Sequence, residues 1–181
     1  MGKTTLIMSN EYNNPDSLDS GEFDVPKLPT GLNVLTILTF IGSAFALYST
    51  VSAFLTAETS YQKREEVINQ MKSPEVPAFV KGFLPPVEHL DEMFTNSFEN
   101  RFPIFILGLV ATAMCIFGAL QMRKLKKQGF LFYVIGQLLP FFTTVLFVGM
   151  FIFSGSLIIF FSVVSLLFIL LYFFQRKHLI Y

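Results

Sequence analysis

The chain has 181 residues, of which 52% are apolar and only 14% are charged. Soluble domains carry about a quarter of their residues as charged side chains, so this composition argues against a water-soluble domain. The formal net charge is zero, which excludes the strongly basic balance of a nucleic-acid-binding protein, and we expect no nucleic-acid partner. Because Cys115 is the single cysteine, no disulfide can form within the chain.

Residues 1–32 form a polar segment that is rich in acidic side chains. A cleavable signal peptide needs a short basic start followed by an apolar stretch, and this segment has neither. We therefore expect a flexible cytoplasmic tail, followed by a first apolar span that serves as an uncleaved anchor.

Four apolar spans follow, at 33–55, 103–122, 130–153 and 156–174, and none contains an acidic, basic or histidine residue. Each is close to the ~20 residues that an α-helix needs to cross ~30 Å of hydrocarbon. Lipid offers no hydrogen bonds to the backbone, so the spans must be helices. The predicted fold is all-α, with residues 33–181 forming an integral membrane four-helix bundle.

Small side chains share one helix face in each of the first two spans, and such faces let backbones approach closely in lipid. We expect the first and second spans to pack together through them, with a contact between two copies of the chain as the alternative. These helix-packing candidates are Gly42, Ala46, Ala53, Gly108, Ala111, Cys115 and Ala119.

The link at 56–102 is too long for a turn and is predicted to be partly helical. After Pro86, which suits a first helical turn, four apolar residues recur at helical spacing. They form a possible interaction face that would lie on the membrane surface, on a partner, or on the end of the bundle. These residues are Val87, Leu90, Phe94 and Phe98.

His89 stands beside Glu88 and Glu92 in this link and is the only candidate for a metal ligand or for the catalytic group of a lipid-handling enzyme. One histidine with one carboxylate or Met93 at helical spacing falls short of a metal site. The sequence contains neither an HExxH nor a GxSxG motif. We therefore predict no enzyme activity, no metal and no cofactor.

Four cations lie between the second and third spans, and cytoplasmic loops are enriched in lysine and arginine. The link at 56–102 carries eight acidic and five basic residues and is placed outside. With four spans, both termini are then cytoplasmic. The topology-determining residues are Arg123, Lys124, Lys126 and Lys127.

The third span holds the most polar intramembrane side chain, Gln137, together with Pro140, Thr143 and Thr144. An amide in hydrocarbon needs a hydrogen-bond partner. We expect either a hydrogen bond across helices or a polar path lined by these residues. The fourth span is apolar on all sides, and the short "FSGS" stretch before it predicts that the third and fourth spans are antiparallel neighbours.

The segments "LPTGLNVLTILTFIGSAFALYS" and "MRKLKKQGFLFYVIGQLLPF" resemble a set of small uncharacterised four-span membrane proteins of Bacteroidota. The resemblance covers most of the chain from Val25 onward, apart from the outside link. It implies a bacterial inner membrane protein and carries no activity or functional residues.

These features favour a non-enzymatic accessory or scaffold subunit that binds a larger membrane complex. Its expected partners are the lipid bilayer and a protein in the membrane, and a homo-oligomer is also possible. The alternative function is a small oligomeric channel or uncoupled carrier with a polar path near Gln137.

Overall fold

The computed structural model describes residues 29–179, so most of the expected tail at 1–32 lies outside the described residues. Within this range the chain forms α-helices and 3-10 segments and no β-strand. Four helices are long and apolar enough to cross a membrane: α1 (Thr30–Gln62), α5 (Arg101–Arg123), α6 (Gln128–Phe147) and α7 (Ser156–Gln175). The predicted fold class of a four-helix membrane bundle is confirmed.

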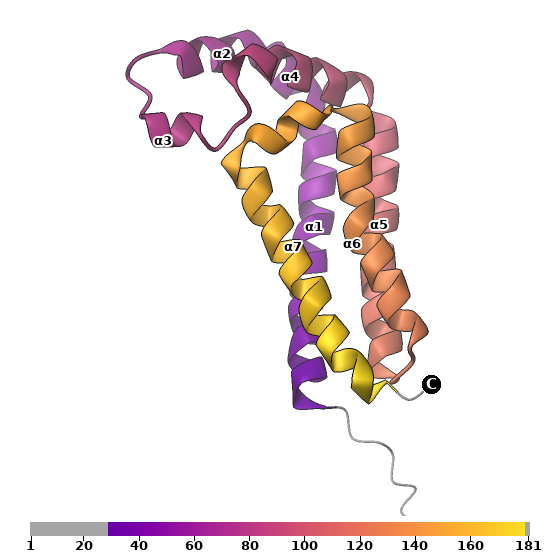
Figure 1. Cartoon of the computed structure of the whole chain (residues 1–181). Helices are drawn as coiled ribbons and strands as arrows, with labels where there is room; N and C mark the ends of the chain where they lie inside the picture. Colours follow the sequence, from indigo (N-terminus) through magenta and orange to yellow (C-terminus); the bar gives the residue numbers. More distant parts are fainter. Residues whose placement is uncertain (1–28, 180–181) are drawn as a thin grey trace, which may run out of the picture.

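The link between α1 and α5 is partly helical, as predicted, and lies across one end of the bundle (Figure 1). It contains α2 (Arg64–Lys72), α3 (Ala78–Lys81), the 3-10 segment η2 (Val87–His89) and α4 (Leu90–Glu99). We call this end the loop end. The opposite end carries the α5–α6 turn and η4 (Arg176–His178), and we call it the basic end.

α5 and α6 form the tightest helix pair, because glycines bring their backbones into contact. A Cβ atom on Gly118 of α5 would lie 2.7 Å from the carbonyl oxygen of Gly129 of α6. A Cβ atom on Gly136 would lie 2.8 Å from the Cys115 sulfur. Contacts this short leave no room for a side chain. The small face of α5 that carries Cys115 therefore packs mainly against α6, whereas we expected it to pack against the first span.

The turn between α5 and α6 explains why a leucine stands among the four cations. Leu125 has a φ of 56°, a conformation that costs a non-glycine residue of order 1–2 kcal/mol. Its side chain is buried in the core at the basic end, next to Met122, which offsets that cost. The neighbouring residues Arg123, Lys124, Lys126 and Lys127 are exposed.

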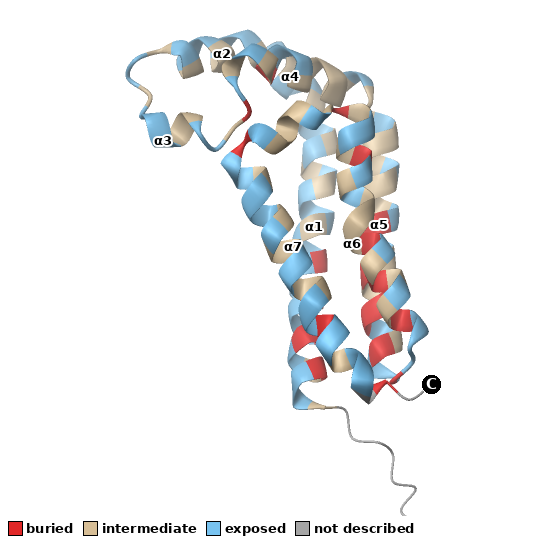
Figure 2. Cartoon of the chain, viewed as in Figure 1, coloured by how far each residue is buried: buried red, intermediate tan, exposed pale blue. Residues whose placement is uncertain are grey.

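Burial is concentrated at the basic end, as Figure 2 shows along the lower parts of α1, α5 and α6. The core there joins α1, α5, α6 and α7 through a set of buried side chains. Its members are Leu32, Leu35, Cys115, Met122, Leu125, Tyr133, Tyr172 and Leu179. The bundle is thus closed at this end. α1 also packs against α5 further along, where a Cβ on Gly108 would lie 2.8 Å from the Thr50 methyl carbon.

The third span ends earlier than the sequence predicted. α6 stops at Phe147, and Gly149 follows with a φ of +128°, a conformation that glycine adopts readily. The apolar run then continues as η3 (Met150–Ser154), which lies across the loop end. Because this segment separates the two helices, α7 begins away from α6 and leans toward the other helices only at the basic end (Figure 1).

The glycine contacts predict two opposite outcomes for the same substitution. Gly118→Ala places a methyl group against backbone atoms of α6 and should cost about 1–3 kcal/mol through overpacking. Gly42→Ala is the matched control, because a Cβ there meets nothing within 4 Å, and it should be neutral or slightly stabilising. Thermal unfolding of both variants in detergent measures the difference. Equal stability of the two variants would contradict the close α5–α6 contact.

Candidate functional site

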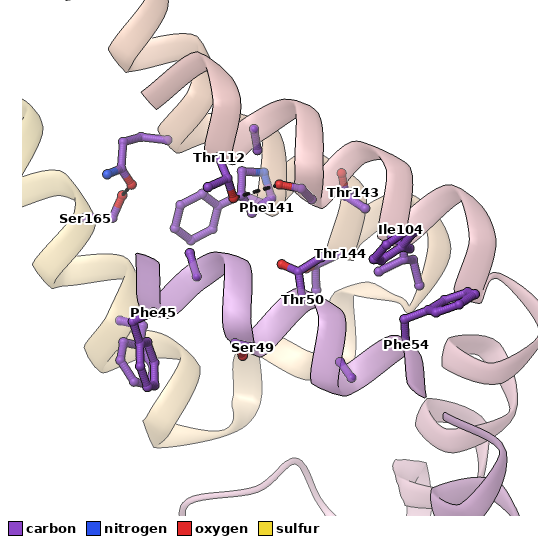
Figure 3. A pocket seen from close by; sticks show the side chains of 18 of the residues that line it. Phe45, Ser49, Thr50, Phe54, Ile104, Thr112, Phe141, Thr143, Thr144 and Ser165 are labelled. Carbon is purple, nitrogen blue, oxygen red and sulfur yellow. Dashed lines mark hydrogen bonds between the residues drawn. The ribbon is translucent and has the colours of Figure 1, made fainter. Parts of the chain in front are cut away.

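A cavity of about 880 Å³ lies between α7 and the other three long helices. Residues of α1, α4, α5, α6 and α7 line it. Figure 3 labels some of those from α1, α5, α6 and α7. Small residues on α1 form one wall, among them Gly42, Ala46 and Ala53. Phe105 of α5 and Phe141 of α6 line the cavity as well. Its volume falls within the range of about 300–1,000 Å³ that is usual for ligand pockets.

Two tyrosines close the cavity toward the basic end. The Tyr172 hydroxyl of α7 and the Thr39 hydroxyl of α1 share a hydrogen bond of 2.7 Å. The rings of Tyr172 and Tyr133 lie 4.5 Å apart, and both side chains are buried. Leu32 and Leu35 add a buried apolar layer next to this closure. The cavity therefore ends blindly within the bundle.

Gln137 bonds within the bundle on both sides of its amide. Its Nε2 donates to the Tyr133 hydroxyl at 2.9 Å, and its Oε1 accepts a hydrogen bond from Ser165 of α7 at 2.9 Å. Ser165 is labelled in Figure 3. The Ser165 bond joins α6 to α7 halfway along the bundle. Of the two expectations for Gln137, the geometry matches a hydrogen bond across helices.

The remaining polar candidates of the third span also line the cavity. The Thr143 hydroxyl donates to the Leu139 carbonyl one turn earlier, a bond that satisfies it within its own helix. Thr144 and Pro140 are part of the cavity wall. Thr112 of α5 bonds back to Gly108 in the same way as Thr143.

The loop end supplies hydrogen bonds to the ends of α6 and α7. Asn96 of α4 donates through Nδ2 to the carbonyl of Val148 at 2.9 Å, at the C-terminus of α6. Ser156 donates through its backbone N–H and its hydroxyl to the carbonyl of Gly82, at 2.9 and 2.7 Å. Gly155 is required beside it, because a Cβ there would lie 2.9 Å from the carbonyl oxygen of Phe83.

The predicted interaction face of the link turns mostly toward the protein. Leu90 is buried, and Phe98 stacks on Tyr61 of α1 with ring centroids 4.6 Å apart. Phe94 and Phe98 line the cavity at the loop end. Val87 lies apart from them, beside a second, more polar hollow formed with α2. The face thus packs largely on its own bundle.

His89 takes part in packing and in one loose polar contact. Its ring stacks on Phe151 of η3 with centroids 4.9 Å apart, and its Nδ1 lies 3.6 Å from a carboxylate oxygen of Glu92. Within residues 29–179, no group of three potential metal ligands comes together. His89 therefore has a structural role, because its ring packs the link against η3.

Arg101 is the one charged residue among the described residues that line the cavity, and the sequence analysis did not identify it as a candidate. It begins α5, and its guanidinium lies over the Phe98 ring at 4.3 Å and the Phe102 ring at 5.4 Å. In the described part of the chain it makes no salt bridge. The available signal was a cation two residues before the second apolar span, but the sequence analysis counted Arg101 only among the basic residues of the link at 56–102.

Comparison of the chain with protein-family models, with curated proteins and with solved structures finds no match. The resemblance to four-span proteins of Bacteroidota therefore stays a prediction that depends on the two quoted segments.

The Gln137–Ser165 bond makes a prediction of energetic coupling. Ser165→Ala should destabilise the chain by about 0.6 kcal/mol, the average for a hydrogen bond between membrane helices. In a Gln137→Leu background the same substitution should have no effect. Ser162→Ala is the matched control, because its hydroxyl donates only within α7, to Ile158, and its effect should be equal in both backgrounds. Unfolding by denaturing detergent, followed by the helical circular dichroism signal, gives the four stabilities. An unchanged Ser165→Ala effect would refute the coupling.

Proposed function

We propose that this membrane protein is a non-enzymatic accessory subunit that binds a protein of a larger membrane complex along the outward side of α7. The observation that carries the proposal is the position of α3. This short helix extends past the N-terminus of α7, away from α5 and α6 (Figure 1). Phe79 on this helix is 68% exposed, and Phe83, two residues after the end of the helix, is 45% exposed.

α7 offers a continuous apolar surface below this overhang. Its side chains at 161, 164, 165 and 168 line the cavity, so the opposite side of the helix points away from the bundle. That outward face consists of Ile159, Val163, Leu166 and Leu170, all of which are exposed. A partner's transmembrane helix could lie along this face. The part of the partner that continues outside the hydrocarbon would then contact α3. The combined surface suits a partner that has both a membrane span and an external part.

The geometry gives less support to the alternative of a channel or carrier. A conducting path must cross the whole hydrocarbon layer, whereas the cavity ends at the Tyr133–Tyr172 pair. Gln137, the residue on which the alternative depended, has both ends of its amide bonded within the bundle.

We further propose that the chain lies in a bacterial inner membrane with the basic end in the cytoplasm. Arg176 and Lys177 are exposed at the same end as the four cations of the α5–α6 turn. Placing all of them in the cytoplasm agrees with the distribution of lysine and arginine in membrane proteins. Both termini would then be cytoplasmic.

Site-specific photocrosslinking in cells tests the partner surface. A photoreactive residue at Leu166, on the outward face of α7, should form a covalent product with one protein. The same protein should co-purify with the tagged chain in mild detergent at a constant ratio. Leu146 is the matched control site, because it is exposed on α6, away from α3, and should give no such product. A crosslink to a second copy of the chain, or recovery of the chain alone as a monodisperse monomer, would contradict the proposal.

The contribution of α3 has a separate test. Phe79→Ser combined with Phe83→Ser should reduce the amount of co-purified partner several-fold, because it removes the exposed aromatic pair. Met150→Ser is the control, since Met150 is also an exposed apolar residue at the loop end but lies on η3. An equal loss of co-purified partner in both variants would contradict a role of α3 in the binding surface.

Cysteine labelling tests the orientation in intact cells. A membrane-impermeant maleimide should label Glu75→Cys at the loop end and should leave Lys126→Cys at the basic end unlabelled until the cells are opened. Cys115 is buried, so maleimide labelling of the unmodified chain measures the background signal. Labelling of Lys126→Cys in intact cells would reverse the proposed orientation.

A further inference from the structure

The cavity is open on one side to the surroundings of the bundle. Phe45 of α1 and Phe161 of α7 both line it and are 67% and 53% exposed, so they form the rim of a lateral opening between these helices. Gly42 and Ser49, on the same wall, are exposed as well. Since α1 and α7 cross the membrane, this opening faces lipid and not water.

The position of Arg101 relative to the membrane follows from the length of α5. This helix runs from Arg101 to Arg123, which at 1.5 Å per residue is about 33 Å. A hydrocarbon core is about 30 Å thick, so the two arginines lie close to its opposite boundaries. Arg101 thus lies near the headgroups of the leaflet at the loop end, while the apolar part of the cavity extends below it.

The lining below Arg101 has the dimensions and chemistry of a site for an acyl chain. From Phe54 to Thr39, the α1 wall covers a depth of about 22 Å at 1.5 Å per residue. Aromatic rings and small residues dominate this stretch, and no acidic side chain is among the described residues that line it. The blind end at Tyr133 and Tyr172 limits how far a chain can enter.

We propose that the cavity binds one anionic phospholipid from the leaflet at the loop end. One acyl chain occupies the groove between α1, α6 and α7, and the phosphate lies against the guanidinium of Arg101. Arg101 is well suited to this, because guanidinium and phosphate form paired hydrogen bonds and no carboxylate of the described residues competes in a salt bridge. The lateral opening admits the lipid directly from the bilayer, with its second chain remaining outside.

This lipid site is distinct from the partner surface proposed above. The lipid occupies the side of α7 that carries Ser165 and Phe168, and the partner would contact the opposite side, around Leu166. The two proposals can therefore fail independently of one another.

Native mass spectrometry of the purified full-length chain tests the site. The chain is incubated in detergent with equimolar dioleoyl-phosphatidylglycerol and dioleoyl-phosphatidylcholine. The anionic lipid should be retained about fivefold more strongly, the value expected for one favourable charge contact near a membrane surface. Arg101→Gln should abolish this preference, and Arg101→Lys should keep most of it. Equal retention of the two lipids by the unmodified chain, or a preserved preference in Arg101→Gln, would overturn the proposal.

Filling the groove provides a second measurement that does not depend on Arg101. Gly42→Leu places a side chain into open space within the cavity and should reduce retention of both lipids several-fold. Ala113→Leu is the matched control, because Ala113 is exposed on α5 outside the cavity, and retention should be unchanged. If Gly42→Leu retains lipid as the unmodified chain does, the acyl chain does not lie in this groove. If oleate at equal concentration displaces phosphatidylglycerol from the chain, the site binds a free fatty acid and not a phospholipid, and the proposal is overturned.

Discussion

The attachment of α7 at its two ends is the interaction on which the cavity and the proposed roles depend. At the basic end, Tyr172 is buried against Tyr133 and hydrogen-bonded to Thr39. At the loop end, Ser156 is hydrogen-bonded to Gly82. The Gln137–Ser165 bond is the polar contact between these points. A helix held in this way leaves a space along its inner side and presents an apolar surface on its outer side.

The cost of unpaired backbone groups near hydrocarbon explains why the link folds as it does. The first amides of a helix and its last carbonyls have no partners within the helix, and water is scarce at this depth. Asn96 satisfies a carbonyl at the end of α6, and the segment at Gly82 and Phe83 accepts hydrogen bonds from the start of α7. The link therefore acts as a structural cap for two spans.

The sequence predicted the number and type of the spans, because length and hydropathy determine which segments can cross a bilayer. It also predicted the helical stripe through Leu90, Phe94 and Phe98. It did not predict the end of α6, because apolarity continues through η3 while Gly149 breaks the helix. It also could not show which neighbour a small face contacts. The face with Cys115 packs on α6, and the face with Gly42 lines a cavity, although both follow the same spacing rule.

The separation of α7 from α1 is tested most directly by pulsed electron paramagnetic resonance on spin-labelled chains in lipid nanodiscs. One label pair, at Val34 and Phe174, reports on the basic end, and a second pair, at Tyr48 and Leu157, reports on the half nearer the loop end. All four side chains are exposed, so the labels should not disturb packing. A clearly longer distance for the loop-end pair is the predicted result. Equal distances for the two pairs would mean that α7 lies flat along α1, and the cavity would not exist.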